Sequence, residues 1–250
     1  MLTDVRVAFA FLTRIPIKHS EQVVMHRAAR WFPLVGVIIG LVSGSTFYFL
    51  THFLPALPSA VIALLVSTLI CGGFHQDGLA DVADGVVGGW TTEQRLEILK
   101  DSRHGTYGVL ALILQYALQV SMLSSMRPIW GFVALVIANS LGRVVPVIMM
   151  SGKAAPGGAG MGASYSREIT FFDTLIAGTV SAFPLFFGLQ IYSLLLLAIL
   201  LLVNVIFYKY VERKIGGVVG DVLGASEQIS ETVILFFILL LSFHGVKVSW

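Results

Sequence analysis

Long apolar stretches recur along this 250-residue chain, and they limit what it can fold into. Hydrophobic residues make up 56% of the sequence and charged residues only 12%, and the mean hydropathy is +0.88. Soluble domains carry about 25% charged residues, so this chain is too apolar for that class. An apolar helix of about 20 residues crosses a bilayer because it satisfies its own backbone hydrogen bonds in lipid. The sequence therefore predicts an all-α, polytopic integral membrane protein, with residues 1–250 forming a single membrane-embedded domain.

Seven apolar stretches are predicted to span the bilayer. The predicted spans are 33–53, 58–74, 107–123, 129–150, 172–188, 191–208 and 231–247. The N-terminal segment 1–32 is basic, and its first part is predicted to form a short helix at the membrane surface that ends at Pro16. Three further polar segments separate the spans, at 75–106, 151–171 and 209–230.

Charged residues collect in these four polar segments, which hold 13 of the 16 Lys and Arg residues. Twelve of the 14 acidic residues lie there too, and the other two, Asp173 and Glu231, border predicted spans. The positive-inside rule then places the N-terminus in the cytoplasm and the C-terminus outside. Polar groups gathered at one membrane face favour an enzyme over a transporter, which needs polar groups along a path through the bilayer. The net charge of +2 is too small to indicate a nucleic-acid partner.

The most polar stretch, 72–108, reads GGFHQDGLADVADGVVGGWTTEQRLEILKDSRHGTYG. Asp77, Asp81 and Asp84 stand at i, i+4 and i+7, which predicts three carboxylates on one face of a helix. Carboxylates so close repel one another unless a cation compensates, and their hard oxygens suit Mg²⁺ or Mn²⁺. The pattern favours a metal-assisted phosphoryl-transfer site, and the alternative is a solvated acidic loop.

Neighbouring residues supply the other groups that such a site needs. Lys100, Asp101 and Arg103 follow in the KDSR block, and its two cations are suited to phosphate oxygens. His75 precedes Asp77 by two positions. It could bind a phosphate, accept a proton, orient an aspartate, or serve the structure alone.

Isolated polar residues occur in the apolar part of the chain. Arg143 follows Asn139 by four positions inside a predicted span, so it either faces a polar interior or extends to the cytoplasmic interface. Asp221 stands among glycines in GGVVGDVLGA and is predicted to contact a ligand. Glu227 and Glu231 precede the last predicted span, where favourable charge placement at a helix N-terminus explains them.

The loop 151–168 is rich in glycine and alanine. It is either a flexible connector or a nest of backbone amides for phosphate. The single cysteine, Cys71, excludes an internal disulfide and is interpreted as a small apolar residue in a helix.

The polar blocks together resemble a known family, the cobalamin synthases, also called adenosylcobinamide-GDP ribazoletransferases. The resemblance covers most of the chain and rests on FLTRIP (11–16), RWFPLVG (30–36), GGFHQDGLADVADG (72–85), KDSRHGTYG (100–108), the Gly-rich 157–162 loop and GGVVGDVLGA (216–225). The family often has Leu where Gln76 stands and Thr where Val219 stands. The second difference removes a hydroxyl ligand but leaves Asp221 in place.

The resemblance implies a multi-pass enzyme of the cell inner membrane that acts late in cobalamin assembly. It would join adenosylcobinamide-GDP to α-ribazole, or to its 5′-phosphate, and release GMP with Mg²⁺ as cofactor. The residues expected to act are His75, Asp77, Asp81 and Arg103 in catalysis, Asp77, Asp81 and Asp84 as metal ligands, and Lys100, Asp101, Arg143 and Asp221 in substrate binding. The proton acceptor stays open between a carboxylate and His75.

Two other functions remain open at this stage. The DGLAD element also resembles the DG-x-x-A element of CDP-alcohol phosphotransferases, which act on lipids, although Asp81 stands where that family has Arg. A multipass transporter is the second alternative. The sequence also leaves open the oligomeric state, whether a homo-oligomer or a complex with other cobalamin-pathway enzymes.

Overall fold

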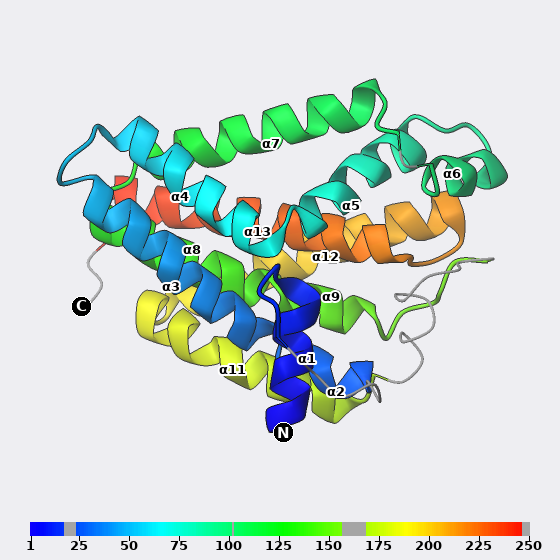
Figure 1. Ribbon diagram of the computed structural model, residues 1–250, viewed down its shortest axis with the longest axis horizontal. Coiled ribbons are helices and arrows are strands. Elements are labelled where there is room, and N and C mark those ends of the chain that lie inside the picture. The colour runs from blue at the N-terminus through cyan, green and yellow to red at the C-terminus, as the bar shows by residue number, and fades with distance from the viewer. Residues whose placement is uncertain (18–23, 102, 157–168, 247–250) are drawn as a thin grey trace.

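The computed structural model describes residues 1–17, 24–101, 103–156 and 169–246 (Figure 1). Every regular element in these ranges is a helix, apart from one isolated bridge between Ala154 and Val218. The helices in chain order are α1 (Leu2–Leu12), α2 (Met25–Ala29), α3 (Phe32–Leu50), α4 (Ala56–Cys71), α5 (Phe74–Val82), the π-helical turn η1 (Ala83–Val87), α6 (Thr92–Ile98), α7 (Thr106–Ser124), α8 (Pro128–Gly142), α9 (Val144–Met149), α11 (Phe171–Leu189), α12 (Tyr192–Ile215) and α13 (Gly220–Phe243). The prediction of an all-α membrane protein is confirmed.

Within the described residues, six helical segments are long and apolar enough to cross a membrane. They are Met25–Leu50, Thr106–Ser124, Pro128–Met149, Phe171–Leu189, Tyr192–Ile215 and Gly220–Phe243. The pair formed by α4 and the helical stretch Phe74–Val87 passes the same test together, although its halves meet at 94°. Counted as one broken span, this pair raises the number to seven, the number predicted from the sequence.

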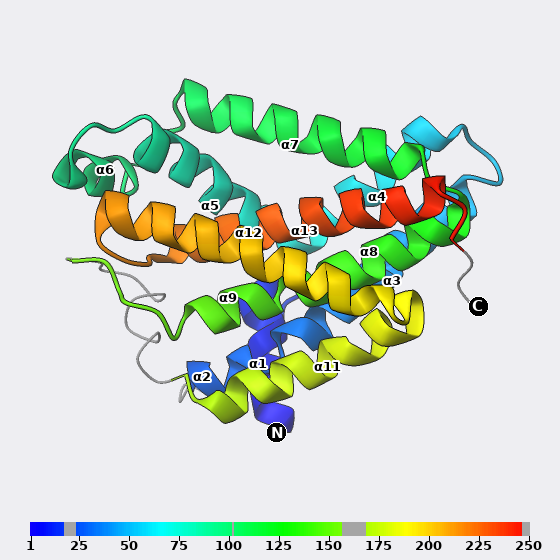
Figure 2. The same cartoon turned by 180° about the vertical axis from the view of Figure 1, so that it is seen from behind.

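The acidic stretch 75–106 and the basic end of α12 lie together at one end of the helix bundle. Figure 1 shows α6, the far end of α5, the start of α7 and the end of α12 at the right, and the end of α13 at the left. The reverse view in Figure 2 shows the same grouping at the opposite side of the picture. The chain thus brings its acidic stretch and its basic helix ends to a common face, as the charge pattern predicts.

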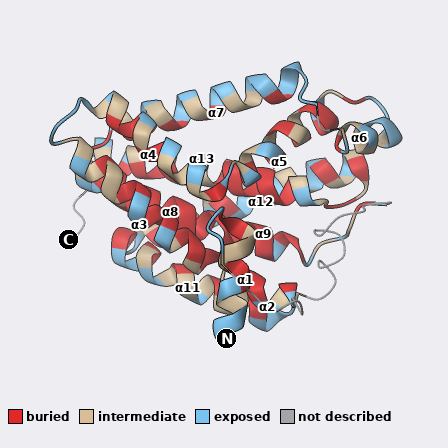
Figure 3. Ribbon diagram, in the orientation of Figure 1, coloured by how far each residue is buried: buried red, intermediate tan, exposed pale blue. Residues whose placement is uncertain are grey.

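Helix α8 forms the centre of the bundle, and Figure 3 shows it largely buried. In the most apolar stretch of the span Pro128–Met149, 83% of the residues are buried, against 17% in the corresponding stretch of α12. Helix α3 packs closely on α8 because glycines recur every fourth residue: a Cβ at Gly36, Gly40 or Gly44 would meet the α8 backbone. The outer faces of α7, α11 and α12 expose large apolar side chains, which suit contact with lipid.

The last span differs from its prediction. The sequence predicts a polar segment over 209–230 and a span over 231–247, whereas α12 continues to Ile215 and α13 already begins at Gly220. Hydropathy marks only the part of a helix that lies in lipid, and both helices have 24 residues, more than the roughly 20 that a bilayer requires. Asp221 therefore lies in the first turn of a long helix.

Two glycines make the bend between α4 and α5. Gly72 and Gly73 have φ values of 70° and 73°, in the left-handed region that side chains other than glycine rarely adopt. Gly72 ends α4, and Gly73 stands just before α5. The sequence predicts that the acidic stretch leaves the membrane after residue 74, but the bend instead turns it into a helix that stays packed in the bundle.

Candidate active site

Helix α5 carries the acidic stretch and packs tightly against the first turns of α13. A Cβ added to Gly78 would lie 2.7 Å from the backbone oxygen of Asp221, and one added to Gly224 would lie 3.3 Å from His75 Cα. Only glycine permits so close an approach of the two helices. The contact joins the DGLAD element to the GGVVGDVLGA element, which are more than 130 residues apart in the sequence.

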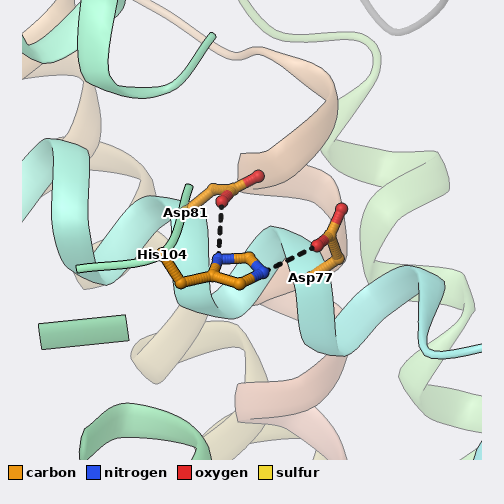
Figure 4. Close-up of side chains that lie close together, drawn as sticks. All are labelled: Asp77, Asp81 and His104. Carbon is orange, nitrogen blue, oxygen red and sulfur yellow. Dashed lines mark ion pairs between the residues drawn. The ribbon is translucent and has the colours of Figure 1, made fainter. Parts of the chain in front are cut away.

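Asp77, Asp81 and His104 form a cluster at the surface of α5 (Figure 4). His104 Nε2 lies 3.5 Å from Asp77 Oδ1, and His104 Nδ1 lies 3.5 Å from Asp81 Oδ1. One ligand atom from each residue falls within 4.8 Å of the others. The imidazole thus stands between two carboxylates that are one helical turn apart, and all three groups can face the same bound ion.

Asp84 does not join this cluster, in contrast to the prediction of three carboxylates on one face. Its carboxylate accepts hydrogen bonds from the backbone N–H groups of Gly105 (2.7 Å) and Gly108 (2.9 Å). These amides belong to the N-terminal end of α7, where N–H groups lack helical partners and favour a negative charge. The spacing is misleading because α5 ends at Val82 and the wider π-helical turn then changes the direction of the following side chains.

A cavity of about 260 Å³ lies beside the cluster. Five of the residues predicted for the site line it: His75, Asp77, Lys100, Arg143 and Asp221. They come from α5, the end of α6, the break between α8 and α9, and α13. The structure thus gathers residues from distant parts of the chain, and Asp77 belongs both to the cluster and to the cavity wall.

Asp101 and Arg103 bond to each other in an exposed segment between α6 and α7. The Arg103 side chain donates to both carboxylate oxygens, at 2.7 Å from Nη2 and 3.0 Å from Nε, and its backbone N–H donates at 3.0 Å. These bonds lower the pKa of Asp101 from its ordinary 3.8 to about 2. The structure does not bring either residue to the cavity lining, unlike Lys100.

Arg143 is buried in an ion cluster behind the cavity. Its side chain is 2% exposed, and Nη1 lies 3.0 Å from Glu227 Oε1 and 3.3 Å from Glu231 Oε1. Nη1 also donates to the backbone oxygen of Asn139, and Nη2 donates to Cys71 Sγ at 3.3 Å. Of the two interpretations of Arg143, the polar interior is therefore confirmed and the extension to the interface is wrong.

Glu227 connects this ion cluster to His75. Glu227 Oε2 lies 3.3 Å from His75 Nδ1 and accepts a hydrogen bond from Gln228 Nε2 at 2.8 Å. Both the His75 ring and the Glu227 side chain are buried. The interpretation of Glu227 and Glu231 as charges at a helix N-terminus is wrong, because α13 begins seven residues before Glu227 and the two glutamates face Arg143.

Sequence reasoning missed His104 and the role of Glu227. His104 lies in the KDSRHGTYG block, between Arg103 and Gly105, the N-cap residue of α7. Its position next to charged residues could have indicated a place in the site. For Glu227 the signal was helical spacing: Asp221, Gly224, Glu227 and Glu231 recur every three or four residues, which places them on one face. The Gly-rich 157–162 loop lies outside the described residues.

The residues of the cluster fit a divalent cation. Two carboxylates and an imidazole converge within 4.8 Å, and this donor set offers two hard oxygen ligands, as Mg²⁺ and Mn²⁺ require. Asp77 is exposed, and Asp81 is partly exposed, so the cluster can be reached from outside. Mg²⁺ ordinarily takes one or two protein carboxylates and completes its shell with water and substrate phosphates.

Comparison with known proteins gives the site a context. The family model for cobalamin-5-phosphate synthase matches residues 4–239. An adenosylcobinamide-GDP ribazoletransferase of Shewanella baltica (strain OS185) is 40% identical, with 94% of this chain and 92% of the relative aligned. Proteins of the same name from Shewanella piezotolerans (34% identical; 98% and 95% aligned) and Ralstonia pickettii (35% identical; 93% and 93% aligned) are also similar.

No solved structure matches the chain. The match to the family model begins in α1 and ends in α13, so the carboxylate cluster, the cavity and the buried ion cluster all lie inside the matched region. The chain belongs to the cobalamin-5-phosphate synthase family.

Proposed function

We propose that the chain is an adenosylcobinamide-GDP ribazoletransferase. It would join adenosylcobinamide-GDP to α-ribazole, or to its 5′-phosphate, and release GMP, which attaches the lower ligand in the last step of cobalamin synthesis. The relatives carry this activity in their names. The observation that carries the proposal is the position of Asp77, which belongs to the carboxylate cluster and also lines the cavity.

We propose Mg²⁺ as the cofactor, held by Asp77 and Asp81 with His104 beside them. When bound, the ion would neutralise charge on the donor diphosphate and make GMP a better leaving group. The convergence of these ligand atoms within 4.8 Å supports the assignment. Asp84 supports the site differently, since its bonds to the first amides of α7 fix the turn η1 against α7 and hold the segment that carries His104.

The reaction is an attack by a ribose hydroxyl on the phosphorus that carries the cobinamide. The new oxygen–phosphorus bond forms while the bond to the bridging oxygen breaks, and GMP leaves with that oxygen. His75 accepts the hydroxyl proton at Nε2, because Nδ1 faces Glu227 and the ring lines the cavity. Glu227 holds the ring in this orientation, as carboxylates commonly do for functional histidines.

The remaining predicted residues take binding roles. Lys100 lines the cavity and would attract phosphate oxygens as a point charge. Asp221 also lines the cavity and would accept a hydrogen bond from a substrate hydroxyl. Arg103 is adjacent to His104 in the chain, and its planar fork would turn from Asp101 to the donor phosphate.

We infer that the enzyme lies in the cell inner membrane with its N-terminus in the cytoplasm. The end of α12, with Arg213 and Lys214, supports this orientation, because it lies on the face that carries the acidic stretch and the positive-inside rule assigns a basic face to the cytoplasm. GDP-linked substrates would then reach the site from the cytoplasm.

The test is a reaction with defined substrates. Membrane vesicles that contain the protein are incubated with adenosylcobinamide-GDP, α-ribazole and Mg²⁺, and complete cobamide and GMP are measured. Both products should appear in equal amounts with the wild type and be lost with Asp77→Asn. Glu93→Gln, at an exposed acidic position on α6, is the matched control and should retain activity.

Rival functions predict different results from the same vesicles. A CDP-alcohol phosphotransferase would release CMP from a CDP-activated lipid and ignore the corrinoid. A transporter would accumulate a solute without cleaving the diphosphate. If no GMP is released from adenosylcobinamide-GDP at saturating Mg²⁺, the proposed activity is wrong.

A further inference from the structure

The cavity has an apolar wall whose chemistry differs from that of the carboxylate cluster. Aromatic and aliphatic side chains from five helices form this wall, namely Phe11, Met25, Phe32, Phe74, Leu96 and Leu99. Three of the rings contact one another: Phe11 stacks on Phe32 with centroids 5.6 Å apart and meets Phe74 edge-on at 5.3 Å. Such a wall favours a flat, apolar aromatic group over a charged one.

The polar groups of the cavity come from other elements. His75 and Asp77 belong to the first turns of α5, Asp221 to the first turn of α13, and Lys100 follows α6. A ligand bound here can therefore place an apolar ring against the phenylalanines while a hydroxyl group meets His75 and Asp77. A nucleoside with an apolar base has this combination of parts.

The size of the cavity suits the acceptor nucleoside and excludes the larger corrinoid donor. Its volume of about 260 Å³ is close to the lower end of the range, about 300 to 1,000 Å³, that is typical of pockets for drug-sized ligands. A corrin ring with its adenosyl group and GDP chain has several times as many atoms as a nucleoside and cannot enter. Guanine alone is small enough, but its amide and amino groups would lie against carbon atoms and lose their hydrogen bonds to water.

We propose, on the basis of the proposed function, that this cavity binds the aromatic base of the acceptor nucleoside and sets which lower-ligand base the enzyme uses. α-Ribazole carries a dimethylbenzimidazole, whose two methyl groups and fused rings match the apolar wall. Its ribose lies toward α5, where His75 meets the attacking hydroxyl. The corrinoid donor stays outside and reaches in only with its diphosphate, beside Asp77.

Wild-type inhibition kinetics test the assignment without any substitution. Free 5,6-dimethylbenzimidazole should compete with α-ribazole and should not compete with adenosylcobinamide-GDP. Competition with the donor alone would overturn the proposal and assign the cavity to guanine. Absence of inhibition against either substrate, at concentrations well above the KM for α-ribazole, would also overturn it.

A size-changing variant tests the wall itself. Leu96→Phe adds bulk at a partly buried wall position and should raise the KM for α-ribazole about tenfold, since an added group in an apolar pocket changes specificity by about 10- to 200-fold. The KM for the riboside of unsubstituted benzimidazole, which lacks the two methyl groups, should rise less. Leu110→Phe on the lipid-facing side of α7 is the matched control and should leave both KM values unchanged.

The outcomes separate this inference from the proposed function. If the wild type makes no cobamide, the proposed function itself fails. If the wild type is active and Leu96→Phe raises the KM for the donor alone, or changes neither KM while folding normally, only the base-binding cavity is wrong. A raised acceptor KM with an unchanged donor KM supports the proposal.

Discussion

Replacing Arg143 by methionine should strongly destabilise the protein, because Arg143 is the positive charge shared by the buried Glu227 and the partly buried Glu231. The guanidinium lies 3.0 Å from Glu227 and 3.3 Å from Glu231, and the Glu227 side chain has no exposed surface. Arg143→Met keeps an unbranched, though shorter, apolar side chain and removes the guanidinium from Glu227, which keeps its contacts with His75 and Gln228. Breaking a buried ion pair in this way costs about 3–5 kcal/mol.

The loss can be measured as the free energy of unfolding in mixed micelles with increasing SDS. A loss of about 3–5 kcal/mol lowers the ratio of folded to unfolded protein between about 100-fold and a few thousand-fold. Arg127→Met is the matched control, because Arg127 caps the other end of α8 and is exposed. Its substitution removes the same charge without uncovering a buried carboxylate.

A double substitution isolates the contribution of the pair. Glu227→Gln removes the negative charge that Arg143→Met leaves behind, so the double variant should lose less stability than the sum of the two single losses. If Arg143→Met is no more destabilising than Arg127→Met, or if the losses of Arg143→Met and Glu227→Gln simply add, the ion cluster does not stabilise the fold as argued.

Three further outcomes are expected. A reporter fused after Trp250 should lie outside, because α13 ends at the face opposite the polar segments; a cytoplasmic reporter would exclude seven spans. Asp81→Asn should raise the Mg²⁺ concentration needed for GMP release, and the wild type should need more Mg²⁺ at acidic pH because protons compete for the carboxylates. Asp84→Asn should instead lower thermal stability and leave the Mg²⁺ requirement of the folded enzyme unchanged. The depressed pKa of Asp101, about 2, means that its pair with Arg103 is complete above pH 3.8 and is lost as the pH falls through 2. Arg103→Lys should raise the pKa of Asp101 in a carboxyl NMR titration and slow turnover. An unchanged titration of Asp101 would count against the two-point contact of the Arg103 guanidinium.

The membrane architecture could be predicted from the sequence because lipid imposes one dominant constraint. Each span needs about 20 apolar residues, and hydropathy reports them directly. The errors occur where helices extend beyond the lipid, as at Gly220, or bend inside the bundle, as at Gly72 and Gly73. Both depend on contacts with other helices, which the local sequence does not contain.

The candidate site was predictable in part, for a physical reason. Asp77 and Asp81 are one turn apart, so local helix geometry brings them together, and the cation that they need follows from their charge. His104 and Glu227 approach α5 from distant segments, and the bond of Asp84 to α7 is a tertiary contact. Spacing alone predicts carboxylates on one face; it does not show which of them are already bound by backbone amides.

The buried ion cluster contacts both sides of the bend between α4 and α5. Cys71 ends α4 and contacts Arg143, while His75 lies in the first turn of α5 and contacts Glu227, so the two sides of the bend are held by one pair of opposite charges. Burying charges in this way is costly, and apolar replacements of buried ion pairs are often as stable as the original. We infer that the cluster is retained because it sets the angle of α5 against α13 and points His75 into the cavity. The double variant Arg143→Met/Glu227→Gln should therefore recover stability relative to Arg143→Met without recovering turnover, and parallel recovery of both would show that the cluster serves stability alone.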